Sequence, residues 1–318
     1  MTESPRAARP GRGSPRPPRG SQAPMERQRR RMFWPFAAPA LITYTVIFLV
    51  PIGYAAWTSL YKWDGMGPKQ WRGLKNYQVL FEDSFFRSSL TNTLEILFIG
   101  GACTFVISFA LTLVLREMWG KLFARSVIFF PCLVNAMVFG VLAGFLFSPD
   151  GPVNRILHGL GFSTPPKWLS TDNLFPMIVG TLVWTATGYY TAIIMAAVDQ
   201  IPPYLYEAAE LDGANAFQRF RHITLPLAWD VISVCAVLWT VSSVKIFELI
   251  LVFGGDNSGQ APPAQSWNTA MYVYEEAFPP QSTPALGMAT AASIVSLVMV
   301  ALITVVLRRL MRRDAIQF

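Results

Sequence analysis

The sequence predicts an all-α membrane protein with six transmembrane helices and one short helical segment held in the cytoplasm. The 318-residue chain is 53% hydrophobic and only 14% charged, whereas about 25% of the residues of soluble domains are charged. Six apolar windows each reach about 20 residues, which is the length a helix needs to cross a bilayer. The segments between these windows differ sharply in their content of Lys and Arg, as expected of a membrane protein with a fixed orientation.

The expected spans are the apolar windows themselves. The first window contains Pro35, Pro39 and Pro51, so its helix is expected to be kinked or to begin late. The six spans lie near Phe33–Leu60, Thr91–Leu115, Leu122–Phe147, Leu174–Val198, Leu227–Phe253 and Pro284–Leu307.

The basic residues set the orientation. With the N-terminus inside the cell, the cytoplasmic segments and the start of the third span hold 18 Lys and Arg residues, the external segments hold 7, and Lys245 lies within the fifth span. Because basic residues accumulate on the cytoplasmic side, both termini are expected there. The predicted location is the bacterial cytoplasmic membrane, with lipid as a general partner.

The N-terminal residues 1–31 differ from the rest of the chain. They are rich in Pro, Gly and Arg and hold nine of the 26 basic residues. Such a composition offers too little apolar surface to offset the entropic cost of ordering. We therefore expect a disordered basic tail that orients the first span, with no nucleic-acid partner, followed by one transmembrane domain over residues 32–318.

Side chains suited to catalysis or metal binding are few and scattered. Cys103, Cys132 and Cys235 all lie inside apolar spans without metal-ligand or disulfide spacing. His158 and His222 are isolated. The sequence therefore predicts no catalytic residue, no metal site and no enzyme.

A nucleotide site is also not expected. The Gly-Lys pair at Gly120-Lys121 has Leu115 where a phosphate-binding loop needs its first glycine, and Leu122 where it needs Ser or Thr. The chain is therefore expected to bind no cofactor. Any energy from ATP would have to come from a partner.

The cytoplasmic loop over residues 204–226 is amphipathic and broken at its middle. Tyr204–Leu211 favours a helix after two prolines, and Gly213 offers a break or a C-terminal cap. From Ala214 a second short helix is expected, with Phe217, Phe220 and Ile223 along one side. By its residues alone, this loop suits resting on the membrane surface and docking into a cleft of a partner equally well.

The same loop resembles the signature loop of permease subunits of bacterial ABC importers. The pattern E-A-A-x2-D-G-A-x5-F-x2-I-x2-P is filled at every fixed position. The resemblance implies a type I importer transmembrane domain whose loop is the coupling helix, seated in a groove of an ATP-hydrolysing subunit that uses ATP-Mg, with Glu207 and Gly213 central to the contact. The matching residues are Glu207, Ala208, Ala209, Asp212, Gly213, Ala214, Phe220, Ile223 and Pro226.

Other segments resemble the carbohydrate-importing branch of that family, of the maltose and glycerol-phosphate type. They include APALITYTVIFLVPIGYAAWTSLYKW in the first span and NTAMYVYEEAF before the last span. The resemblance implies a second homologous permease, two ATP-binding subunits, an extracellular solute-binding protein and a carbohydrate substrate. The chain departs from the family pattern after the fifth span, at residues 254–263 and with Glu248 in place of an aspartate, which leaves the substrate less certain.

Several side chains within the spans are candidates for the substrate path. Lys245 and Glu248 are three residues apart, close enough to pair on one helix face. They suit either a paired anchor near the interface or a lining of the path. Aromatic rings stack on sugars, although they also serve in ordinary packing. The aromatic and amide candidates are Asn135, Trp184, Tyr189, Tyr190 and Trp239.

Two further classes of function remain as alternatives. Within the same family, the solute could be a polyol, glycerol phosphate or another small molecule. An ion-coupled secondary transporter would need carboxylates near the membrane midplane and an internal repeat, and the sequence shows little of either.

Overall fold

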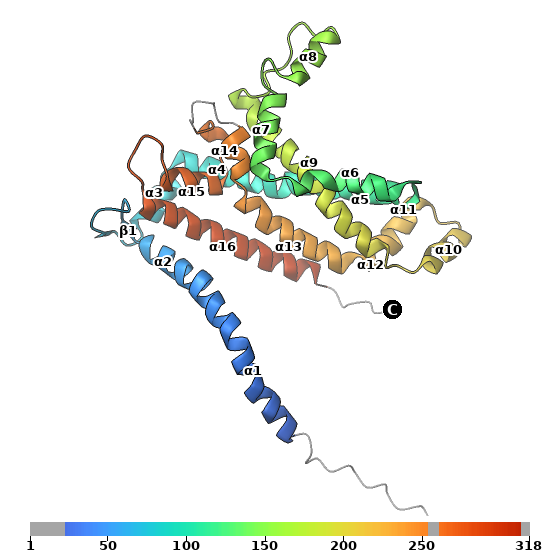
Figure 1. Cartoon of the computed structure of the whole chain (residues 1–318), viewed down its shortest axis with the longest axis horizontal. Coiled ribbons are helices and arrows are strands. Elements are labelled where there is room, and N and C mark those ends of the chain that lie inside the picture. The colour runs from blue at the N-terminus through green and yellow to red at the C-terminus, as the bar shows by residue number, and fades with distance from the viewer. Residues whose placement is uncertain (1–22, 254–260, 313–318) are drawn as a thin grey trace, which may run out of the picture. The chain divides into compact units, whose positions relative to one another are not determined.

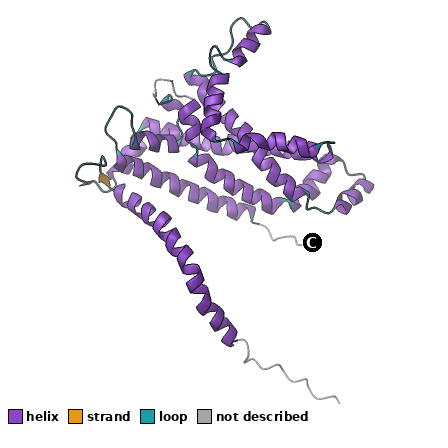
Figure 2. Cartoon of the chain, in the orientation of Figure 1, coloured by secondary structure: helices purple, strands orange, loops and turns teal. Residues whose placement is uncertain are grey.

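The computed structural model describes residues 23–253 and 261–312. Helices make up most of the described chain, and the two strands form one short hairpin (Figure 2). The chain divides into two units, residues 1–54 and residues 55–318. Four helices are long and apolar enough to cross a membrane, or up to six if each of two bent pairs is one span, which agrees with the six predicted windows.

The first span is continuous helix from Ala23 to Thr58, labelled α1 (Ala23–Tyr44), η1 (Thr45–Leu49) and α2 (Val50–Thr58). The π-helical turn η1 immediately precedes Pro51. Because proline cannot donate to the carbonyl four residues earlier, the wider turn accommodates that loss. The tail that we expected to be disordered through Arg31 is helical from Ala23, and residues 1–22 lie outside the described residues.

A compact corner follows the first span. Strands β1 (Tyr61–Lys62) and β2 (Gln70–Trp71) pair antiparallel. The side-chain amide of Asn76 donates to the carbonyls of Ser59 and Tyr61 at 2.7 and 2.8 Å. A Cβ on Gly287 would overlap the Tyr61 carbonyl oxygen, so only glycine lets the last span approach this corner. Helix α3 (Lys75–Glu82) completes it.

The second and fourth spans are long helices that pack against each other. The second span comprises α4 (Ser84–Glu95), the π-helical turn η2 (Ile96–Gly100) and α5 (Gly101–Glu117). The fourth span is α9 (Thr171–Val198), which also packs against the third span (Figure 1).

The third span is bent, which the sequence prediction of one window did not anticipate. Helices α6 (Lys121–Leu133) and α7 (Ala136–Leu146) meet at 97°. Pro131 removes a hydrogen-bond donor in the last turn of α6, and the side chain of Asn135 caps α7 by accepting from the backbone of Met137 at 2.8 Å. Together these residues end one helix and start the next. Helix α8 (Pro152–Gly159) lies in the following external segment.

The fifth span is also interrupted. The loop before this span forms α10 (Pro203–Leu211), α11 (Ala216–Arg219), η3 (Phe220–Thr224) and α12 (Leu225–Leu227), and the span itself is α13 (Trp229–Lys245). A break at Ile246 separates α13 from α14 (Glu248–Phe253). The buried Asn268 side chain donates to the Ile246 carbonyl that the break leaves free, so the interruption is satisfied internally.

The chain ends with the sixth span. A 3-10 turn, η4 (Ala264–Ser266), and the short helix α15 (Thr269–Ala277) lead into α16 (Leu286–Met311). Helix α16 packs along both α13 and α15. The largest buried apolar cluster lies among the second to fifth spans and includes Ile178, Tyr190, Trp239 and Leu249. This cluster borders the cavity described next.

Candidate functional site

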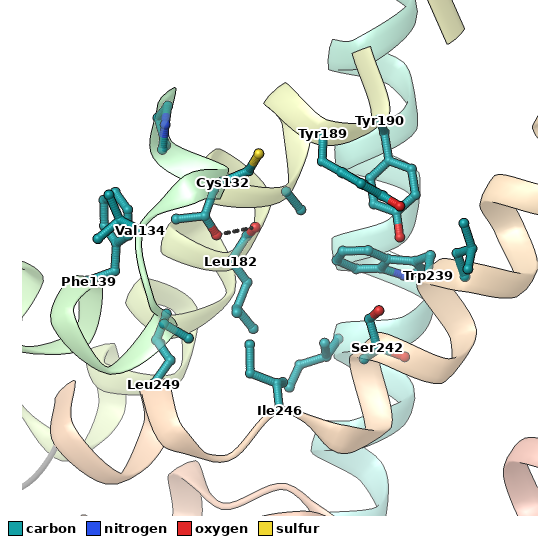
Figure 3. Close-up of a pocket in the computed structure, with 17 residues that line it drawn as sticks. Cys132, Val134, Phe139, Leu182, Tyr189, Tyr190, Trp239, Ser242, Ile246 and Leu249 are labelled. Atoms are coloured by element: carbon teal, nitrogen blue, oxygen red, sulfur yellow. Dashed lines mark hydrogen bonds between the residues drawn. The ribbon is translucent and has the colours of Figure 1, made fainter. Parts of the chain in front are cut away.

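A cavity of about 400 Å³ lies among the second, third, fourth and fifth spans. The break between α6 and α7 supplies one wall, and α9 and α13 supply the other (Figure 3). No Asp, Glu, Lys, Arg or His contributes to the described lining. The side chains that shape it include Cys132, Val134, Phe139, Leu182, Thr185, Tyr189, Tyr190, Trp239, Ser242 and Ile246.

Three aromatic rings stand together on one side of this cavity. The rings of Tyr189 and Tyr190 pack edge to face, with their centroids 5.2 Å apart. The rings of Tyr190 and Trp239 pack in the same way, with their centroids 5.9 Å apart. Ser242 lies beside them on the same wall (Figure 3). Rings with polar ends next to a serine hydroxyl give a surface that can stack on an apolar face and also exchange hydrogen bonds.

Trp239 is fixed by the second span. Its indole nitrogen donates to the carbonyl of Leu97 at 2.9 Å, within the π-helical turn η2. Cβ atoms placed on Gly100 and Gly101 would crowd the Trp239 ring, so the glycine pair makes room for it. A π-helical turn inside a helix is frequent at functional sites, and here it positions the largest ring of the cavity.

Gly188 permits the close approach of α6 to α9 beside the tyrosines. A Cβ at this position would overlap the backbone carbonyl of Ile128 on α6. Neither Gly188 nor Ser242 was predicted from the sequence as a site residue. A glycine within a predicted span, directly before a tyrosine pair, is a recognisable signal of close helix packing. No comparable signal marks Ser242.

The structure brings together only part of the predicted aromatic and amide set. Tyr189, Tyr190 and Trp239 line the cavity. Asn135 lies between two lining residues but uses its side chain to cap α7. Trp184 is 55% exposed and packs edge to face on Phe139, outside the described lining.

Lys245 and Glu248 do not form the pair that their spacing suggested. The helix break at Ile246 places Lys245 at the end of α13 and Glu248 at the start of α14. Both are exposed, and among the described residues they share no ion pair. The expectation of a pair on one helix face was therefore wrong, because the helix is interrupted between the two residues. Lys245 borders a separate apolar groove between α13 and α16.

The loop over residues 204–226 has a defined turn at its centre. Helix α10 ends in a Schellman motif. The backbone N–H of Ala214 donates to the carbonyl of Ala209 at 2.9 Å, and the backbone N–H of Gly213 donates to the carbonyl of Glu210 at 3.0 Å. Gly213 has φ of +77°, which glycine adopts without strain. A Cβ there would meet nothing within 4 Å, so the space beside the turn is open. Glycine is therefore required for its backbone conformation and not for its small size.

The second helix of the loop begins later than expected, at Ala216. Asn215 and Gln218 form a capping box with hydrogen bonds of 2.8 and 2.9 Å. Arg219 contacts Glu210 across the turn at 3.2 Å, which links the two helices. The loop is thus a preformed bent unit.

One face of the loop is anchored to the membrane domain. The hydroxyl of Tyr206 shares a 2.9 Å hydrogen bond with Thr224, and the Arg116 guanidinium lies 3.8 Å from the centre of the Tyr206 ring. Phe220 packs on Phe109 of the second span. These contacts link the loop to the ends of the second and fifth spans.

The other face is open. The side chains of Leu211 and Phe217 are 90% and 67% exposed, and Glu207, Ala208, Asp212 and Gly213 are exposed as well. Ala209, Ala214, Phe220, Ile223 and Pro226 are half-buried. Phe217 and Phe220 line one hollow together, as expected of residues along one side, although Phe217 is the more exposed of the two. Large apolar side chains presented to water mark a surface for a partner.

The external loop at which the sequence departs from the family pattern is only partly described. Residues 254–260 lie outside the described residues. Beyond them, the Asn92 side chain holds the turn before α15 by donating to the carbonyls of Gln265 and Trp267 at 2.7 and 2.8 Å.

Comparison with known proteins gives consistent matches. The family described as "Binding-protein-dependent transport system inner membrane component" matches residues 104–313. The lactose transport system permease protein LacF of Rhizobium radiobacter is 30% identical over 85% of this chain and 91% of its own length. The trehalose/maltose transport system permease protein MalF of Thermococcus litoralis is 30% identical over 87% and 92%.

Solved structures match the fold. A bacterial ABC transporter involved in the import of the acidic polysaccharide alginate superposes with a TM-score of 0.76 at 21% identity, covering 93% of this chain and all of that chain. The alginate transporter in complex with a pentasaccharide-bound periplasmic protein superposes with a TM-score of 0.75. At this identity the likeness concerns the fold.

Proposed function

Because the chain belongs to the family of binding-protein-dependent transport system inner membrane components, we propose that it is the permease subunit of an ATP-driven importer for a carbohydrate. The observation that carries this proposal is the preformed loop over residues 204–226, anchored on one face and open on the other. Relatives named for the transport of lactose, trehalose and maltose support the substrate class.

The open face of α10 and α11 is the proposed seat of an ATP-hydrolysing subunit. Glu207, Leu211 and Phe217 would enter a groove of that subunit, and Gly213 would hold the two helices at their angle. Closure of two such subunits around ATP-Mg would move the loop. Through Tyr206 and Phe220, this motion would bias the transmembrane bundle between inward-facing and outward-facing states. This chain itself performs no chemistry on ATP or on the sugar.

The cavity among the second to fifth spans is the proposed contact with the passing sugar. Tyr189, Tyr190 and Trp239 would stack on its apolar face while Ser242 meets a hydroxyl. The described lining carries no acidic or basic side chain, which favours a neutral sugar over glycerol phosphate. The cavity volume of about 400 Å³ lies within the range of small-molecule sites.

The remaining partners complete the importer. A second homologous permease would complete the path, as the resemblance to importer permeases implies. An external solute-binding protein would deliver the sugar to the side opposite the loop. The distribution of basic residues supports a cytoplasmic position for both termini and the loop.

Co-purification from detergent-solubilised membranes tests this proposal. Wild type should bring down an ATPase and a second permease, and Glu207→Ala and Gly213→Pro should lose the ATPase while keeping the permease. The matched control is Glu82→Ala, an exposed glutamate on the external helix α3. If wild type purifies alone and intact, the importer proposal fails. If the complex forms but moves only non-sugar solutes in proteoliposomes, the carbohydrate part fails alone.

A further inference from the structure

A further hollow lies between the start of α13 and the end of α16, and it shares Leu238 with the lining of the cavity among the second to fifth spans. Its volume is about 670 Å³. The indole nitrogen of Trp229, the first residue of α13, donates to the carbonyl of Met311 at 2.8 Å, so the two helix ends meet at one membrane boundary. This boundary is the cytoplasmic one in the proposed orientation.

The lining of this hollow changes from charged to apolar along the helices. Arg308, Arg309 and Arg312 stand at the boundary with Asp230 opposite them. Further into the span the walls are apolar, formed by Val234, Val237, Leu238 and Val305. Three arginines against one aspartate leave a positive surplus, and among the described residues none of these four charged side chains forms an ion pair.

We propose that this hollow binds an anionic phospholipid of the adjacent leaflet, with the phosphate on the arginines and an acyl chain along the valines. A guanidinium presents a fork of donors that matches phosphate oxygens. Basic pockets between transmembrane helices on the cytoplasmic side bind anionic head groups. A soluble anion would use the arginines but leave the apolar part of the hollow empty.

Charge also argues against a protein occupant of the same family. A second copy of this chain brings a surplus of Lys and Arg to the same boundary, since 18 of its 26 basic residues lie there. Such a partner would place cations against Arg308, Arg309 and Arg312. A lipid phosphate supplies the missing negative charge, while Asp230 remains free to meet the ammonium or hydroxyl end of a head group.

Spin-labelled lipids measure the proposed binding directly. The assembled complex is placed in phosphatidylcholine membranes with traces of spin-labelled phosphatidylglycerol or phosphatidylcholine, and the motionally restricted fraction of each is compared. We expect selectivity for phosphatidylglycerol. A basic residue near a membrane surface contributes about fivefold to the binding of anionic lipid. The triple variant R308Q/R309Q/R312Q should therefore lower the selectivity of the site for phosphatidylglycerol by about tenfold or more.

Two further variants make the test specific. R72Q/R87Q/R155Q removes the same number of charges from exposed positions in the external segments and should keep the selectivity. Val305→Trp fills the apolar part without changing charge and should remove restricted phosphatidylglycerol, which a soluble-anion site would not predict. Assembly of the complex by size-exclusion chromatography checks that each variant folds.

The outcomes that overturn the inference are distinct from failure of the proposed function. The lipid site is refuted if wild type restricts both lipids equally. It is also refuted if the triple variant keeps the wild-type selectivity for phosphatidylglycerol. Selectivity shown by the isolated chain but lost in the assembled complex means that another subunit covers the hollow, and this also refutes it. None of these results depends on which solute is transported.

Discussion

The indole nitrogen of Trp239 donates a 2.9 Å hydrogen bond to the carbonyl oxygen of Leu97, which joins the fifth span to the π-helical turn of the second. Both partners are buried. The bond sets the position of the ring that lines the proposed sugar cavity. It therefore connects a local irregularity of one helix with a surface that a substrate could touch.

Trp239→Phe should impair both stability and transport. The change leaves the Leu97 carbonyl without its donor, and an unsatisfied buried acceptor costs about 1–3 kcal/mol. We expect a lower melting temperature in detergent and reduced sugar uptake in proteoliposomes. Trp184→Phe is the control, since Trp184 is 55% exposed and should tolerate the change. Equal effects of the two substitutions would contradict the positioning role.

Gly188→Ala should disrupt the packing of α9 against α6. The added methyl group would overlap the carbonyl of Ile128, and overpacking of a close interface costs about 1–3 kcal/mol. Gly180 lies on the same helix and has nothing within 4 Å of a Cβ position. Gly180→Ala should therefore be neutral or stabilising by about 0.5–1 kcal/mol. Thermal unfolding of both variants checks the difference, and a stable Gly188→Ala protein would refute the packing argument.

Substitutions at Gly213 should follow backbone conformation and not side-chain size. Its φ of +77° is costly for most residues by about 1–2 kcal/mol, and Asn is tolerated best. We expect coupling, measured as ATPase stimulation by the binding protein in the complex, to decrease in the order Gly, Asn, Ala, Val. A result in which Ala equals Gly and Asn is inactive would point to a steric clash with the partner instead.

The external cluster around Glu276 should make stability depend on pH. Burial, and secondarily the nearby Asp83, raise the pKa of Glu276 above its ordinary value of 4.5. Because the folded state holds this proton more tightly than the unfolded state, stability is greatest below pH 4.5 and falls as the pH rises through the raised pKa. Glu276→Gln should reduce that decline, and Glu275, whose pKa burial also raises, should retain part of it.

Melting temperature against pH, for wild type and Glu276→Gln, measures this effect. Glu82→Gln, on exposed α3, is the matched control and should leave the curve unchanged. The Tyr272 hydroxyl donates to Asp83 at 2.7 Å and keeps the cluster assembled in both proteins. Identical slopes for wild type and Glu276→Gln above pH 4.5 would contradict the assignment.

Much of the architecture was predictable because the bilayer imposes it. Length and hydropathy identify helices that must satisfy their own backbone, and the predicted all-α fold with its six windows was confirmed. The loop pattern around Glu207 and Gly213 predicted the family, which the comparisons confirmed. The roles of the loop and cavity residues stay predictions.

The sequence by itself therefore determined the helical membrane fold and the family, since these depend on apolar length and on a local pattern of residues. Only the tertiary structure decided which side chains share a cavity. Pro131 and Asn135 bend the third span by 97°, and the break at Ile246 separates Lys245 from Glu248. Hydropathy cannot register such breaks, because the carbonyls that they free are satisfied by residues distant in the chain, as Asn268 satisfies Ile246.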